Sequence, residues 1–232
     1  AEPKNTLLLL CSPHNPTGKV WRREELQTMA ALCQKHGVRV ISDEIHMDMT
    51  WGDHRHIPWS EVAQGPWALF TSGSKSFNIP AFTGAYGFIP EANCRDSYLQ
   101  ALKARDGLSS PSVPALVAHI AAYRDGAPWL DALRDYLQEN LRFVADTLNR
   151  AFPALRWQPP EATYLAWIDL RPLNIDDRAL QQALIAGQKV AIMPGYTYGP
   201  EGNGFLRLNV GCPREKLERG VAGLIAALRS LS

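Results

Sequence analysis

The sequence has 232 residues, 46% of them hydrophobic, and its 24 Lys and Arg residues nearly balance 23 Asp and Glu residues, for a net charge of +1. This composition is typical of a globular protein, and it lacks both the basic excess of a direct nucleic-acid binder and the long apolar segment of a membrane protein. The four cysteines are widely spaced and form no Cys-x-x-Cys pair. We therefore expect reduced thiols and a cytoplasmic protein.

Three short apolar segments in the first third of the chain have the length of buried parallel strands. They cover residues 7–12, 38–42 and 68–72. An amphipathic helix expected at 24–36 connects the first two, and a right-handed crossover makes such strands parallel. Ligands of open α/β sheets bind at the carboxyl ends of the strands, where the sequence places Asn15, Asp43 and Lys75.

These three side chains carry complementary chemistry. An amine among few charges, such as Lys75, loses its proton more readily and can attack an aldehyde. A carboxylate such as Asp43 can pair with a protonated pyridine nitrogen, and the amide of Asn15 can donate to a phenolic oxygen. Each motif alone also fits an ordinary turn or a surface residue, but their order along the chain predicts a site for an aromatic aldehyde cofactor held as a Schiff base.

A metal site is the competing interpretation of the region around Asp43. Its candidate ligands are Asp43, Glu44, His46, His54 and His56. The histidines lie in a long loop without a tight helical or Cys-paired spacing. We therefore favour the cofactor site and predict no metal.

Arg207 stands in an apolar segment, 205–210, with the pattern of a strand. A guanidinium can bind a carboxylate through two parallel hydrogen bonds, and amino-acid substrates carry such a group. A water-facing arginine on an edge strand is an equally good interpretation of this residue taken alone.

A long amphipathic helix expected at 128–152 separates two domains, 1–127 and 128–232. The first domain also has a further strand expected at 83–89. For the second domain the sequence predicts strands at 163–170, 190–193 and 205–210 and helices at 176–186 and 214–228. This order is typical of a small α+β domain.

Longer sequence runs identify a family resemblance. They are residues 10–13, 42–49, 72–80, 193–199 and 211–214. Together with Asn-Pro-x-Gly, Asp-x-x-aromatic and Ser-x-x-Lys elements in order, they resemble fold-type-I pyridoxal-5′-phosphate enzymes of the class I and II aminotransferase superfamily. Within it, the sequence is most similar to bacterial cystathionine β-lyases that also repress the maltose regulon.

The resemblance implies an aspartate-aminotransferase-like α/β fold, with a mainly parallel large-domain sheet, of which 1–127 is the carboxyl-terminal part, and a small α+β domain. It implies that Lys75 binds pyridoxal 5′-phosphate covalently and acts as the general base at the substrate α-carbon. Asp43 then pairs with the pyridine nitrogen, Asn15 contacts the ring oxygen O3′, and Arg207 binds the substrate carboxylate.

The remaining cofactor-binding residues implied by the resemblance are Ser72 and Ser74, on the phosphate side, and His46. His46 stands where many aminotransferases carry a tyrosine, and Thr83 falls near the place of a phosphate-binding arginine. Both departures favour the lyase branch. The resemblance also implies a further amino-terminal part that supplies phosphate contacts and an aromatic ring.

We therefore expect a lyase that cleaves cystathionine or a related S-substituted cysteine to a thiol, pyruvate and ammonia. An aminotransferase is one alternative, and a regulatory protein that binds a maltose-regulon transcription activator is another. The resemblance further implies a homodimer in which residues 107–112 reach the neighbouring active site.

Overall fold

A computed structural model describes residues 4–108 and 110–231 of the chain, which divides into two compact units. The first unit combines residues 1–14 with 19–132, and the second combines residues 15–18 with 133–232. Ser109, within the segment expected to reach a neighbouring subunit, lies outside the described residues.

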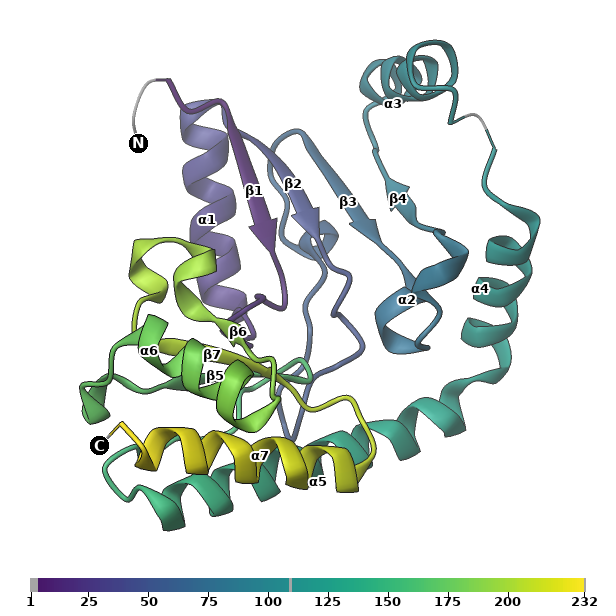
Figure 1. Ribbon diagram of the computed structural model, residues 1–232. Helices are drawn as coiled ribbons and strands as arrows, with labels where there is room; N and C mark the ends of the chain where they lie inside the picture. The colour runs from purple at the N-terminus through teal and green to yellow at the C-terminus, as the bar shows by residue number, and fades with distance from the viewer. Residues whose placement is uncertain (1–3, 109, 232) are drawn as a thin grey trace. The chain divides into compact units, whose positions relative to one another are not determined.

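The strands and helices are labelled in Figure 1. The strands are β1 (Leu7–Cys11), β2 (Arg39–Asp43), β3 (Trp67–Thr71), β4 (Tyr86–Phe88), β5 (Leu165–Asp169), β6 (Met193–Pro194) and β7 (Phe205–Asn209). The helices are α1 (Arg23–His36), α2 (Gly73–Ser76), α3 (Ala92–Gln100), α4 (Val113–Asp125), α5 (Ala127–Ala151), α6 (Asp177–Gln182) and α7 (Arg214–Arg229).

The first unit contains a four-stranded sheet in the order β1-β2-β3-β4. Strands β1, β2 and β3 are parallel, as the β-α-β pattern predicts, while β4 is antiparallel to β3. Cys11 pairs with Asp43, and Asp43 pairs with Phe70. The carboxyl ends of the three parallel strands therefore lie along one edge of the sheet (Figure 1).

Helix α1 covers one face of this sheet. Its buried residues Leu26 and Ala30, each 1% exposed, belong to a core cluster with Leu10 of β1 and Val40 of β2. The helix ends at Gly37, whose φ of 65° lies in the left-handed region that glycine adopts without strain. This packing fixes the crossover that makes β1 and β2 parallel.

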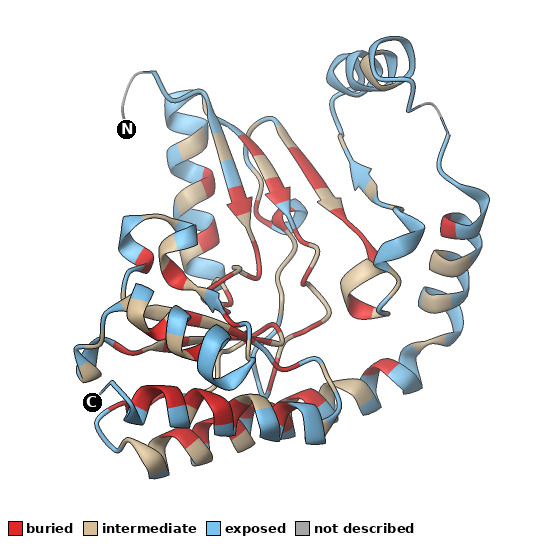
Figure 2. Cartoon of the chain, viewed as in Figure 1, coloured by how far each residue is buried: buried red, intermediate tan, exposed pale blue. Residues whose placement is uncertain are grey.

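The second unit contains a three-stranded antiparallel sheet in the order β5-β7-β6. The long helix predicted at 128–152 is α5, and its residues Leu141 and Leu148 are fully buried. Figure 2 shows the corresponding buried face of α7, which includes Val221 and Leu224. Both helices place one apolar stripe in the core of this unit.

Several predicted boundaries are wrong. The strand predicted at 190–193 begins only at Met193, because Lys189 has a left-handed φ of 56° and the Val190 N–H closes the preceding helical turn on Leu184. The helix predicted at 176–186 is α6 followed by a π-helical turn over Ala183–Gln188. The strand predicted at 83–89 is the shorter β4.

None of the helices in the described part of the chain is long and apolar enough to cross a membrane.

Candidate active site

Lys75 lies on α2, a helix of one turn that directly follows β3. Its side chain is half-buried, between the half-buried Ser74 and the fully buried Ser76. The apolar β3 and the turn after it explain this location, because Ser72, Gly73 and Ser74 have low strand propensity and the Ser72 side chain caps a helical turn instead. The structure thus places Lys75 just beyond the carboxyl end of β3.

Ser72 is the N-cap of α2, and its hydroxyl is committed to internal contacts. Ser72 Oγ accepts a hydrogen bond from the Ser74 N–H at 3.0 Å and donates to the Gly84 carbonyl at 2.6 Å. It also lies 3.2 Å from Nε2 of His119. The phosphate-side roles of Ser72 and Ser74 stay predictions, and Ser74 is the more accessible of the two.

Asp43 is the last residue of β2, and its carboxylate is exposed at the same edge of the sheet. Its Oδ1 accepts a hydrogen bond from the Ile45 N–H at 3.2 Å, and its carbonyl accepts one from Ser12. Asp43 therefore ends β2, and Lys75 follows the adjacent parallel strand β3. This is the arrangement that the sequence predicted for these two residues.

Glu44 is a buried residue for which the sequence suggested only a metal-ligand role. Its carboxylate is 1% exposed and accepts hydrogen bonds from Ser42 Oγ and from the Trp59 N–H, both at 2.8 Å. Nε2 of His56 lies 2.7 Å from the second oxygen. Glu44 is therefore a structural anchor that ties the loop after β2 to the end of that strand.

His46, predicted to bind the cofactor, is 3% exposed in the turn after β2. Its carbonyl accepts a hydrogen bond from the Met49 N–H at 2.9 Å. Over residues 4–108 and 110–231, no group of three or more His, Cys, Asp or Glu side chains is arranged to hold a metal ion.

A second set of polar residues surrounds the other end of α2. Ser76 Oγ donates to Asp48 Oδ2 at 2.6 Å. Burial, followed by its hydrogen bond to Tyr86 and the nearby Asp48 carboxylate, raises the pKa of Tyr123 far above its usual value. Burial is also the main cause that raises the pKa of Tyr86. Both hydroxyls are therefore protonated at neutral pH.

In the second unit, Arg207 is held on two sides. Its Nη1 donates to Oδ1 of Asn15 at 2.9 Å, and its guanidinium lies 5.1 Å from the ring centroid of Tyr198. Trp167 packs edge-on against Tyr198, at 5.5 Å between ring centroids. The sequence predicted Asn15 and Arg207 as separate ligands, but did not predict that one orients the other.

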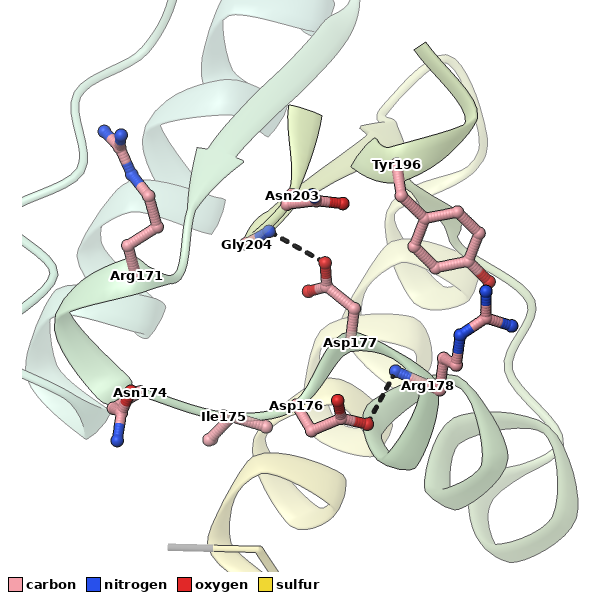
Figure 3. A pocket seen from close by; sticks show the side chains of 9 residues that line it. All are labelled: Arg171, Asn174, Ile175, Asp176, Asp177, Arg178, Tyr196, Asn203 and Gly204. Atoms are coloured by element: carbon pink, nitrogen blue, oxygen red, sulfur yellow. Dashed lines mark hydrogen bonds between the residues drawn. The ribbon is translucent and has the colours of Figure 1, made fainter. Parts of the chain in front are cut away.

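A cavity of about 630 Å³ lies beside α6 in the second unit (Figure 3). Its charged side chains already have partners: Asp177 accepts from the Gly204 N–H at 2.8 Å, and Arg178 lies over the Tyr196 ring. Arg171 is paired with Asp169 at 2.6 Å. None of the predicted catalytic or cofactor-binding residues lines this cavity.

The parallel sheet with a lysine and a carboxylate at its edge and the small antiparallel domain are features of one family. Residues 1–224 match the family described as "Aminotransferase class I and II", and the chain belongs to this family. The resemblance inferred from the sequence motifs is thereby confirmed.

Among curated relatives, the chain is 71% identical over 231 residues to the protein MalY of Escherichia coli strain K12, and it spans 59% of that relative's length. It is 37% identical to the cystathionine β-lyase PatB of Bacillus subtilis strain 168, again over 59% of the relative. The chain thus covers less than two thirds of the proteins it matches.

Two solved structures confirm the expected fold. Cystalysin from Treponema denticola, whose structure contains pyridoxal 5′-phosphate, is 30% identical to this chain with a TM-score of 0.91. The match covers 100% of this chain and 59% of the cystalysin chain. The pyridoxal-phosphate-bound C–S lyase from Staphylococcus hominis is 31% identical with a TM-score of 0.89. The match covers 96% of this chain and 57% of the lyase chain.

Proposed function

We propose that this chain is part of a pyridoxal-phosphate-dependent C–S β-lyase that cleaves cystathionine or a related S-substituted cysteine. The observation that carries the proposal is the position of two residues at the same edge of the sheet: the half-buried Lys75 just beyond β3, and Asp43 at the end of the adjacent parallel strand β2. Relatives named as cystathionine β-lyase and C–S lyase support this choice within the family.

The donor set fits this cofactor. Lys75 supplies the amine that holds it, and Asp43 supplies the anion for its pyridine nitrogen. When bound, pyridoxal 5′-phosphate supplies an aldehyde for amines and a ring that takes up the electron pair left when the substrate loses its α-proton. Asn15 at O3′, Ser72 and Ser74 at the phosphate, and His46 beside the ring complete the proposed assignment.

Two proton transfers are assigned to Lys75. Its neutral Nζ removes the proton from the substrate α-carbon, and the resulting ammonium protonates the sulfur as the bond from the β-carbon breaks. We assign binding of the substrate carboxylate to Arg207, whose guanidinium Asn15 holds in place. Residues 1–127 then belong to the cofactor-binding domain, and residues 128–232 form the linking helix and the small domain.

Lys75→Ala in the complete gene product tests this function. The wild-type protein is expected to release pyruvate from cystathionine and to retain the cofactor on Lys75 after borohydride reduction, as peptide mapping would show. The variant is expected to lose both properties. Lys35→Ala, at an exposed position of α1, is the matched control and should retain both. Equal pyruvate release by wild type and Lys75→Ala would rule out the proposed role.

An aminotransferase is the second candidate, favoured by the family description and by the shared set of Asn15, Asp43 and Lys75. Such an enzyme needs a keto-acid acceptor and releases no ammonia. Ammonia release from cystathionine without a keto acid therefore separates the two reactions.

We further propose a cytoplasmic homodimer, in keeping with the free cysteines of the chain. Sedimentation of the complete gene product at twice the monomer mass tests the dimer. A regulatory role through a maltose-regulon transcription activator is an additional proposal, motivated by the similarity to MalY. Activator binding that persists in Lys75→Ala would separate this role from catalysis, and no binding by either protein would contradict it.

A further inference from the structure

The conformation of α2 depends on contacts at its two ends. A helix of four residues has no stability of its own, because helix nucleation alone is unfavourable. At the carboxyl end, Ser76 is held by Asp48. At the amino end, Ser72 is held by the Gly84 carbonyl and by His119 of α4.

His119 fits a slot between two glycines. A Cβ atom at Gly73 would lie 3.3 Å from Cδ2 of the imidazole, and one at Gly84 would lie only 2.9 Å from Cε1. The ring therefore contacts both the first residue of α2 and the loop before β4; a Cβ atom at Gly84 would overlap it, and one at Gly73 would require it to shift slightly. Its position is fixed by packing on two sides.

Hydrogen bonds fix the orientation of the ring. Nδ1 lies 2.8 Å from the Ala115 carbonyl, which can only accept, so Nδ1 is a donor. In the neutral ring Nε2 is then an acceptor, 3.2 Å from Ser72 Oγ, so the single Ser72 hydroxyl proton is shared between Nε2 and the Gly84 carbonyl, which lies closer at 2.6 Å. Imidazole and carbonyl together hold the hydroxyl that accepts from the Ser74 N–H.

We infer that His119 is a positioning residue for Lys75, acting through its contact with Ser72 at the amino end of α2. The inference rests on the proposed role of Lys75. The lysine side chain has four rotatable carbon–carbon bonds, so its amine is placed reproducibly only when the backbone that carries it is fixed. His119 touches neither the reacting amine nor the substrate in this account.

Paired amide variants of the complete gene product test the inference. His119→Gln retains a polar atom near the place of Nε2 and can still contact Ser72, whereas His119→Asn retains only the contact to Ala115. His36→Ala, at the exposed end of α1, is the control. Two properties are measured: hydrogen exchange of the Ser74 and Phe77 amides without cofactor, and borohydride labelling of Lys75 with added pyridoxal 5′-phosphate.

We expect His119→Asn to accelerate exchange at both amides about fivefold, the equilibrium equivalent of one ordinary hydrogen bond, and to slow labelling of Lys75. His119→Gln should stay close to wild type in both measurements. In a Ser72→Ala background, His119→Asn should have no further effect.

Equal effects of the Gln and Asn variants, or no effect of either, would overturn the inference. An effect of His119→Asn that persists unchanged in the Ser72→Ala background would also overturn it, because a loss of packing volume does not depend on the Ser72 hydroxyl. Failure of the wild-type protein to label at Lys75 would instead contradict the proposed function. The exchange measurement would still decide the role of His119 in that case.

Discussion

Arg207 shows how one side chain can be prepared for a ligand by two different interactions. Asn15 Oδ1 accepts from Nη1, and the Tyr198 ring lies beneath the guanidinium. A charged group held on one edge and one face loses little further freedom when it binds a carboxylate. The remaining nitrogen atoms keep the paired-donor geometry that a carboxylate matches.

Arg207→Lys keeps the charge but removes this geometry. We expect the KM for cystathionine to rise about 10- to 100-fold, the equivalent of one lost charge-assisted hydrogen bond, with a smaller change in kcat. Steady-state kinetics of the complete gene product measures both values.

Arg178→Lys is the matched control for Arg207→Lys, because Arg178 also lies over a tyrosine ring, that of Tyr196. Its kinetics should remain those of the wild type. A KM that rises equally in both variants, or in neither, would contradict the role assigned to Arg207.

The residues predicted from sequence share a location that the strand pattern reveals. Asp43 and Lys75 stand at or just after the ends of apolar segments, and a one-dimensional pattern suffices to find them. His119 and the structural role of Glu44 were missed because their partners are distant along the chain: Ser72 for His119, and Trp59 for Glu44. Only the folded chain brings such pairs together.

At the scale of single elements, the start of α1 holds a glutamate, Glu25, whose pKa lies far below its usual value. The hydrogen bond from the Arg22 N–H is the main cause that lowers the pKa of Glu25 to about 2, and Lys19 adds a second bond at 2.9 Å. The ionised carboxylate also interacts favourably with the helix amino terminus.

Because the folded-state pKa of Glu25 lies below the ordinary value of 4.5, its ionised form stabilises the fold above that pH. The contribution is lost as the pH falls from about 4.5 to about 2. Glu25→Gln should therefore lower Tm at pH 6, and the difference from wild type should disappear as the pH approaches 2. Thermal unfolding followed by circular dichroism across this range measures it.

Glu24→Gln controls for the loss of a negative charge in the same helical turn, since Glu24 is exposed and precedes Glu25. We expect Glu24→Gln to lower Tm less than Glu25→Gln does, and with less dependence on pH. A Tm difference between Glu25→Gln and wild type that is the same at every pH would show that ionisation of Glu25 does not stabilise the fold.

Helices α1 and α5 were predicted because each buries one apolar stripe. Helix α4 was not predicted, because its apolar residues do not form one buried stripe. Ala115 is buried, whereas Val113 and Val117 are 71% and 62% exposed. Periodicity detects a helix only where burial follows that period. The helices most firmly tied to a core are therefore the ones the sequence reveals.

At the scale of the whole chain, residues 15–18 belong to the second unit although they follow β1 of the first. The Ala162 N–H donates to the Gly18 carbonyl at 2.9 Å, and Arg207 donates to Asn15. These contacts join positions far apart in sequence. The turn-forming composition of 15–18 predicted a turn there, but it could not predict the unit in which the turn packs.

Gly18 packs closely against residues 160 and 162 of the second unit. Its φ is +68°, and an added Cβ would lie 2.3 Å from Cβ of Pro160 and 2.6 Å from the Ala162 carbonyl oxygen. Gly18→Ala should thus destabilise the second unit and loosen the Asn15–Arg207 contact. Gly37→Ala is the matched control, because Gly37 has a φ of +65° and no atom within 4 Å of an added Cβ.

Left-handed backbone alone should cost both variants about 1–2 kcal/mol, and the steric overlap should cost Gly18→Ala about 1–3 kcal/mol more. Urea unfolding measures these differences, and cystathionine kinetics should show a raised KM for Gly18→Ala only. Since the two substitutions share their φ, any excess effect at position 18 reports the overlap with Pro160 and Ala162. Equal losses of stability would mean that the turn at 15–18 is free to move away from these residues, and that Asn15 does not depend on them to reach Arg207.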